Sequence, residues 1–150
     1  MAESERLIGK DRETQNQAAF REIVKRGPPP GLLAFDGDLA VGWCQLTPRD
    51  SVPHFDHLWR LKRVDDVSVW CMSCFYVRIA YRRLGVNTAL IRAAIQHAKK
   101  AGAPALEAYP FDRRVSPSST STGFATTFER LGFRTLARHS PERPIMRLNL

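Results

Sequence analysis

The order of strand and helix patterns along this chain predicts a single domain of the α+β class, built as a mixed α/β sandwich. Two β-rich segments flank Asp36-Gly37-Asp38, which is a strong hairpin signal. A further β-rich segment is followed by an amphipathic helix and then by another strand, so that helix is expected to cross over between parallel strands. A final pair of β-rich segments closes the chain. This order is typical of a mixed sheet with helices packed against it.

Glycine, proline and charge delimit the elements in the first half of the chain. Residues 1–12 are polar and are expected to form a flexible lead-in, whereas residues 16–25 carry apolar side chains at helical spacing. Three consecutive prolines at 28–30 end that helix. Strands are predicted at 31–35 and 39–46, a long connection with a little helix at 47–66, and one largely buried strand at 67–78.

The helix predicted at 86–100 has the clearest pattern in the chain, with alanines and Leu90 on one face and Gly102 beyond it as a cap. Because this helix is the crossover, the strands on either side of it should be parallel neighbours. Beyond it we predict a strand at 104–109, a Ser/Thr-rich loop at 116–122, a short helix at 124–131, and a closing hairpin with strands at 134–139 and 144–150.

Composition limits the classes of function. The 150 residues are 43% hydrophobic and 25% charged, which is ordinary for a soluble globular protein. The longest mainly apolar run is too short to span a bilayer, and the first residues lack the order of a secretory signal, so we expect no membrane partner and a cytoplasmic location. The formal net charge of +8 favours an anionic partner. Because Lys and Arg are spread along the chain rather than gathered in one run, nucleic acid is not the expected partner.

The three cysteines give no disulfide framework because their number is odd. Cys71 and Cys74 have C-x-x-C spacing, but residues three apart on a strand point to opposite faces. We therefore expect packing rather than zinc binding, and we predict no metal site. Cys74 as an acyl carrier is the less favoured alternative to packing.

The most informative segment is 77–91, where a strand leads through a basic, glycine-containing turn into the long helix. Such a turn can aim successive backbone N–H groups at one point, and the helix adds the positive end of its dipole. Arg82 and Arg83 supply positive charge beside Gly85, whose missing Cβ permits close approach. The turn therefore predicts a phosphate-binding site.

Arg82-Arg83-Leu84-Gly85-Val86-Asn87 resembles the R/Q-x-x-G-x-G/A pyrophosphate motif of the GCN5-related N-acetyltransferase (GNAT) superfamily. Residues 70–78 and 106–112 are similar to that superfamily's fourth and fifth strands, and 128–133 to the short helix and turn before its last strands. The resemblance implies a GNAT-like acyl-CoA N-acyltransferase fold whose central sheet contains a splayed parallel pair of strands. The first 30 residues contain a helix but no convincing match to the superfamily's N-terminal strand.

The resemblance also implies acetyl-CoA as cofactor, with its pyrophosphate on the turn and its pantetheine pairing with the strand before it. The residues assigned to the cofactor are Phe75, Tyr76, Val77, Arg82, Arg83, Leu84, Gly85, Val86, Asn87 and Thr88. Asn87 stands at the last small position of the motif.

Acetylation of an amine requires a neutral amine, a polarised carbonyl and a proton for the departing thiol. Glu107 and Tyr109 share one face of a strand and are our candidates for proton transfer, with Asp66 behind them, against a solvated or packing role. Phe128 occupies a position where the superfamily often has a tyrosine acid. His54 and His57 are weaker candidates for the acceptor side.

We therefore expect an acetyl-CoA-dependent N-acetyltransferase that acts by direct transfer on a small-molecule or protein amine. A non-catalytic acyl-CoA-binding or sensing module is the alternative. If the N-terminal strand is missing, one edge of the sheet is left open, and a second copy of the chain could cover that edge in a homodimer.

Overall fold

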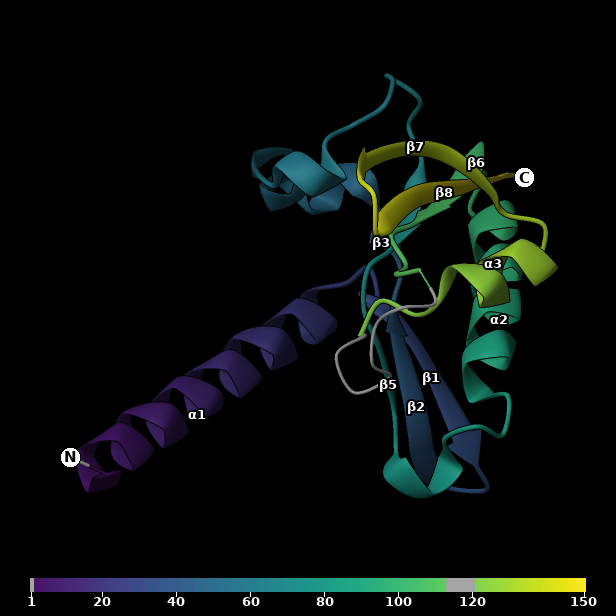
Figure 1. Ribbon diagram of the computed structural model, residues 1–150. Coiled ribbons are helices and arrows are strands. Elements are labelled where there is room, and N and C mark those ends of the chain that lie inside the picture. The colour runs from purple at the N-terminus through teal and green to yellow at the C-terminus, as the bar shows by residue number, and fades with distance from the viewer. Residues whose placement is uncertain (1, 113–120) are drawn as a thin grey trace. The chain divides into compact units, whose positions relative to one another are not determined.

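The computed structural model describes residues 2–112 and 121–150, and the side chains from residue 12 onward within those ranges. The chain divides into two compact units, Met1–Pro30 and Gly31–Leu150, each described here by itself (Figure 1). The predicted Ser/Thr-rich loop falls mostly on residues outside the described ranges. None of the described helices combines the length and the apolar character that a membrane crossing needs.

The first unit is a single helix, α1 (Ala2–Arg26). It begins well before the predicted start at residue 16, so the expected lead-in is helical. Its first residues are rich in Glu, Arg, Lys and Gln, which have high intrinsic helix propensity even without an apolar stripe. The helix ends at Gly27, which has a φ of 62° and donates its N–H to the Ile23 carbonyl at 3.2 Å.

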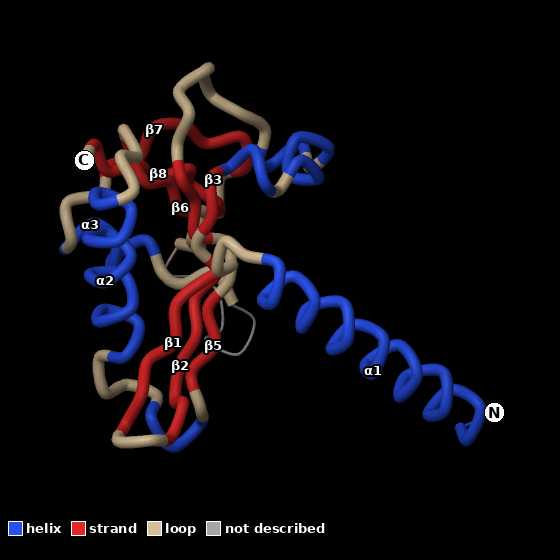
Figure 2. The backbone as a smooth tube through the Cα atoms, turned by 180° about the vertical axis from the view of Figure 1, so that it is seen from behind, coloured by secondary structure: helices blue, strands red, loops and turns tan. Residues whose placement is uncertain are grey.

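Among its described residues, the second unit contains two sheets and two α-helices (Figure 2). A three-stranded antiparallel sheet has the order β1-β2-β5, and a five-stranded sheet has the order β3-β4-β6-β8-β7. The strands are β1 (Gly31–Asp36), β2 (Leu39–Gln45), β3 (Thr47–Pro48), β4 (Trp70–Met72), β5 (Phe75–Val77), β6 (Ala105–Ala108), β7 (Arg134–Ser140) and β8 (Arg143–Asn149). The helices are α2 (Val86–Lys100) and α3 (Ala125–Arg130), and short 3₁₀ turns lie at Arg49–Ser51, Pro53–His57, Trp59–Leu61 and Ile79–Tyr81.

The single strand predicted at 67–78 is wrong, because the chain changes sheet at Ser73 and Cys74. β4 belongs to the larger sheet and β5 to the smaller one. The neighbouring strands β2 and β3 are interrupted at the same level, at Leu46. Gln45 joins the two breaks: its N–H donates to the Cys74 carbonyl at 2.9 Å, and its Oε1 accepts from Ser73 N–H and Oγ at 2.9 and 2.8 Å.

The crossover prediction is confirmed. β4 pairs with β6 in parallel, with Trp70, Cys71 and Met72 opposite Leu106, Glu107 and Ala108, and α2 has the predicted bounds. β5 pairs with β2 and not with β6, so the two strands diverge beyond the break. This is the splayed pair that the resemblance implied.

Successive side chains along the strands of the larger sheet point to opposite faces, and each face carries its own hydrophobic cluster. Met72, Leu106 and Ala108 pack with α2 residues in the main cluster. Cys71, Tyr109 and Ile145 point to the opposite face, where Phe55 and Leu61 from the 49–65 connection cover them. This face is therefore closed by irregular chain rather than by a helix.

Candidate functional site

The turn before α2 alternates its backbone handedness. Arg83 has a φ of 63° and Gly85 a φ of 83°, both in the left-handed region. Alternation of this kind turns successive N–H groups toward one point and makes an anion-binding concavity. A Cβ built on Gly85 would meet no atom within 4 Å, so the space in front of this residue is open.

The N-terminus of α2 has the electrostatics of an anion site. Gly85 is its N-cap; the first turn contains no acidic residue, and no side chain caps it. Asn87 Oδ1 is buried and has no hydrogen-bond partner among the described residues. The first amides of α2 and the positive end of its dipole are thus free to meet a phosphate.

Arginines beside this turn are exposed and little engaged. Arg82 Nε donates to the Val77 carbonyl at 3.2 Å, whereas the Arg83 side chain makes no hydrogen bond or ion pair with the described part of the chain. Leu84, between Arg83 and Gly85, is 70% exposed. The predicted cofactor residues from 82 to 85 therefore form an exposed, cationic turn, and those from 86 to 88 are the half-buried first residues of α2.

Strand β5 presents one edge toward the gap. Arg78 N–H donates to the Val41 carbonyl and the Cys74 carbonyl accepts from Gln45, so both face β2. Alternation directs the peptide groups of Phe75 and Val77 to the other side. Phe75 N–H is already used there, because it donates to the Ser121 carbonyl. On the edge predicted to pair with pantetheine, the peptide groups of Val77 are therefore more available for hydrogen bonding than the N–H of Phe75.

Residues 121–125 bridge the gap between the diverging strands. Phe111 N–H donates to the Gly123 carbonyl at 3.0 Å, and Ala125 N–H donates to the Phe111 carbonyl at 2.9 Å. Phe128 follows in α3, fully buried, with its ring 6.0 Å from that of Phe75. It is a packing residue and has no proton to donate.

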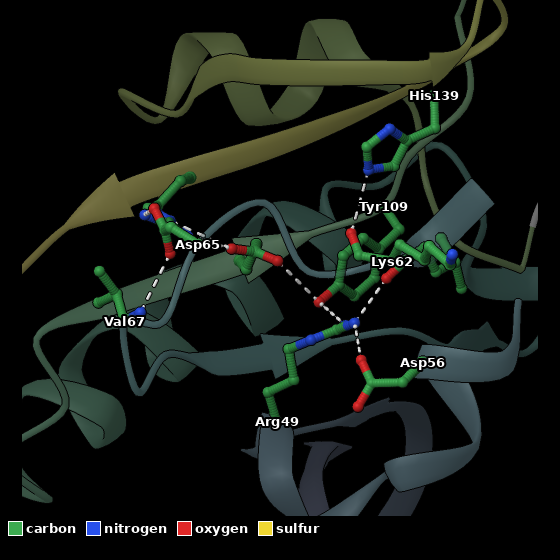
Figure 3. Close-up of polar contacts among 10 residues, drawn as sticks. Arg49, Asp56, Lys62, Asp65, Val67, Tyr109 and His139 are labelled. Atoms are coloured by element: carbon green, nitrogen blue, oxygen red, sulfur yellow. Dashed lines mark hydrogen bonds and ion pairs between the residues drawn. The ribbon is translucent and has the colours of Figure 1, made fainter. Parts of the chain in front are cut away.

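Glu107 and Tyr109 lie together on the face opposite α2, as the period-two argument predicted. Tyr109 Oη donates to Glu107 Oε1 at 3.0 Å and accepts from Arg49 Nη1 at 2.8 Å (Figure 3). Tyr109 is 1% exposed and Glu107 2% exposed. Their proposed role in proton transfer stays a prediction, because these contacts do not test it.

Two arginines surround this pair. Arg49, 2% exposed, donates through Nη2 to Asp56 Oδ1 at 3.0 Å and to the Leu61 carbonyl. Arg147 donates to Glu107 Oε2 from Nε at 3.1 Å and from Nη2 at 2.8 Å, and it holds Asp65 through two further bonds of 2.7 and 2.9 Å. Neither arginine was singled out by the sequence.

The network sets the ionisation of its members. Burial, then the neighbouring Cys71 and Glu107, raise the pKa of Tyr109 far above its ordinary value. Hydrogen bonds from Arg147 lower the pKa of Asp65. Glu107 forms a buried ion pair with Arg147, whose Nη2 lies 2.8 Å from Glu107 Oε2.

The cysteines and histidines form no hydrogen bond of this network. Burial raises the pKa of Cys71 to about 12 and of Cys44 to about 11, which makes both thiols poor nucleophiles. His54 and His57 are exposed on a 3₁₀ turn of the 49–65 connection. The described residues contain no group of three or more His, Cys, Asp or Glu that could hold a metal ion.

Comparison with known proteins identifies the family. The family model described as Acetyltransferase (GNAT) family matches residues 2–127. A search of curated proteins finds no significant match.

Solved structures share the fold at low sequence identity. The NatC complex bound to Gag peptide and CoA has 13% identity and a TM-score of 0.60, covering 89% of this chain and 79% of that chain. YncA of Salmonella typhimurium, a putative acetyltransferase with its cofactor acetyl-CoA, has 18% identity and a TM-score of 0.59, covering 91% and 73%. A ribosomal-protein-alanine N-acetyltransferase from Brucella melitensis has 17% identity and a TM-score of 0.59, covering 91% and 78%.

The left-handed turn at the head of α2, the diverging pair β5 and β6, and a family match over most of the chain agree with one another, and this chain belongs to the GNAT acetyltransferase family.

Proposed function

We propose that this protein transfers an acetyl group from acetyl-CoA to a primary amine by direct transfer between two bound substrates. The observation that carries the proposal is the turn from Arg82 to Gly85, whose alternating handedness, open space and uncapped helix suit a diphosphate. The family match and the cofactors named for YncA and the NatC complex support the choice of a CoA thioester.

The residues present fit such a cofactor. Backbone amides from Gly85 to Thr88 would hold the diphosphate, and Arg82 and Arg83 would balance its charge. The outward peptide groups of Val77 would pair with the pantetheine arm. When bound, acetyl-CoA supplies the acetyl group as a thioester.

The acceptor is an amine of unassigned structure. The names of two structural neighbours mention polypeptides, namely the Gag peptide and a ribosomal protein. A panel of test acceptors should therefore include peptides with free N-termini beside small amines. We place the activity in the cytoplasm, because the three cysteines are free thiols, as is usual in a reducing compartment. A homodimer stays a prediction.

Binding and turnover test the proposal in sequence. Acetyl-CoA and free CoA should raise the melting temperature, whereas NAD and RNA should not, because only a ligand held by the native state stabilises it. Thiol release from acetyl-CoA in the presence of the amine panel should then identify an acceptor. A protein stabilised by RNA but not by CoA would defeat the proposal.

A non-catalytic acyl-CoA-binding or sensing module is the second candidate. It is favoured by the burial of Glu107 and Tyr109 and by the absence of a transferable proton on Phe128, whereas Asp66, the remaining candidate for proton transfer, is exposed. Tight binding of acetyl-CoA without thiol release for any amine in the panel would select this alternative. Turnover with any of them would exclude it.

A further inference from the structure

The 49–65 segment, which is the first part of the connection from β3 to β4, is tied to the larger sheet at two separate places. At one, Arg49 connects Asp56 and the Leu61 carbonyl to Tyr109. At the other, Arg147 connects Asp65 to Glu107. The Tyr109–Glu107 hydrogen bond joins these two connections into one path, of which Figure 3 labels Arg49, Tyr109 and Asp65. The path thus begins and ends in the same segment.

The segment lies on the face of the larger sheet that α2 does not cover. Phe55 and Leu61 pack there against Tyr109 and Ile145. α2 packs on the other face of this sheet, and we therefore assign the acceptor to the face under the 49–65 segment.

Proton transfer would require Tyr109 or Glu107 to reach a substrate, and their bonding leaves little freedom for that. The single proton of the phenol is directed to Glu107 Oε1, and its oxygen already accepts from Arg49. The carboxylate of Glu107 accepts from Tyr109 and twice from Arg147. The polar atoms of Tyr109 and Glu107 thus have partners, whereas Arg49 Nε is buried without one among the described residues. Buried hydrogen bonds of this kind restrict the motion of the groups that make them.

We propose that Tyr109 and Glu107 are positioning residues, which with Arg49 and Arg147 lock the 49–65 segment against the sheet and so shape the acceptor side. The inference rests on the proposed function for its kinetic consequence. The lock itself is a property of the folded chain and is measurable without turnover.

Hydrogen–deuterium exchange of the full chain tests the lock. Tyr109→Phe removes only the hydroxyl and leaves Arg49 Nη1 and Glu107 Oε1 without that partner. We expect amides in 49–65 to exchange at least about tenfold faster, while those of α2 are unchanged. Tyr81→Phe is the matched control, because it removes an exposed tyrosine–carboxylate bond of 2.7 Å to Asp36 and should leave 49–65 unaltered.

A second variant keeps the test decisive if Tyr109→Phe fails to fold. Asp65→Asn weakens the outer end of the path at a half-exposed carboxylate and leaves the Arg147–Glu107 pair intact. Faster exchange near residue 65 supports the lock. Unchanged exchange across 49–65 in a folded Tyr109→Phe or Asp65→Asn protein overturns it.

Kinetics separates positioning from proton transfer. With the amine of the panel that turns over fastest, Tyr109→Phe should raise the acceptor KM about tenfold, while the KM for acetyl-CoA and the pH profile of kcat are retained. A fall in kcat of about a hundredfold or more, with one limb of the pH profile lost, would make Tyr109 a proton-transfer residue and overturn the proposal. Absence of turnover in the unaltered protein would count against the proposed function, and the exchange result would still decide the lock.

Discussion

At the scale of single residues, the turn before α2 depends on Gly85. Its φ of 83° is a conformation that side chains rarely adopt, and its open surroundings leave room for a ligand. We predict that Gly85→Glu abolishes binding of CoA, because a carboxylate would stand where the diphosphate belongs, while the protein stays folded. Calorimetric titration with CoA and circular dichroism measure the two effects.

Gly102→Glu is the matched control for that variant. Gly102 follows the other end of α2, has a φ of 78°, and a Cβ added to it would likewise meet no atom within 4 Å. The backbone strain is therefore similar, but the site is remote from the turn. Equal loss of CoA affinity in both variants would mean that strain, and not the place of the charge, causes the defect.

Residue patterns predicted part of the site. Period two was enough to place Glu107 beside Tyr109, and their hydrogen bond of 3.0 Å confirms that they lie together. Arg49 and Arg147 were missed because their partners lie 60 and 40 positions away, and no local pattern marks such a pairing. Arg147 lies opposite Glu107 on β8, and this pairing can be recognised only when the register between β6 and β8 is known.

At the scale of elements, the common break of two neighbouring strands opens the gap between β5 and β6. Gln45 forms hydrogen bonds across that break with its backbone N–H and its side-chain amide. We predict that Gln45→Leu lowers the free energy of unfolding by about 1–3 kcal/mol, because Ser73 N–H and Oγ lose their acceptor. Urea unfolding followed by tryptophan fluorescence measures the loss.

Gln45→Glu provides the comparison for this prediction. Its carboxylate retains an acceptor for Ser73 and loses only the donor to Thr47. Its destabilisation should therefore be smaller than that of Gln45→Leu. If the order is reversed, the hydrogen bonds to Ser73 are not what holds the two sheets together.

Elements with a local signature were predicted and those set by tertiary contacts were not. α2, α3 and the closing hairpin follow from apolar period, caps and turn residues, and their bounds agree with the prediction within a few positions. The break at Ser73 was missed because the mainly apolar run around it contains no Gly or Pro, and a single serine does not stop a strand. The bonds from Gln45 that define it come from 28 positions away.

At the scale of the whole molecule, its acid stability should reflect the carboxylates held by arginine. Burial alone would raise the pKa of Asp56, but Arg49 and Arg63 lower it overall; Arg147 lowers the pKa of Asp65. A carboxyl whose pKa is lowered on folding stabilises the protein above its unfolded value of about 4 and loses that contribution as pH falls. We predict that the melting temperature drops between about pH 5 and pH 2.5, as thermal denaturation will show.

The double variant Asp56→Asn with Asp65→Asn checks the cause of that drop. At neutral pH the double variant should have a lower melting temperature than the unaltered chain. On acidification its melting temperature should fall by less. Because the formal charge of the chain is already +8, protonation of other carboxylates adds repulsion to both proteins alike. A double variant that loses stability as steeply as the original would assign the effect to net charge alone.

The conformation of Arg83 has a consequence for the chain as a whole. A left-handed arginine costs roughly 1–2 kcal/mol that a glycine in its place would not, a sizeable fraction of the stability of a small domain. Glycine at this position would therefore make the folded state more stable. Arginine at this position therefore opposes the local backbone preference, as is common at functional sites, and we propose that a ligand's negative charge compensates for this cost.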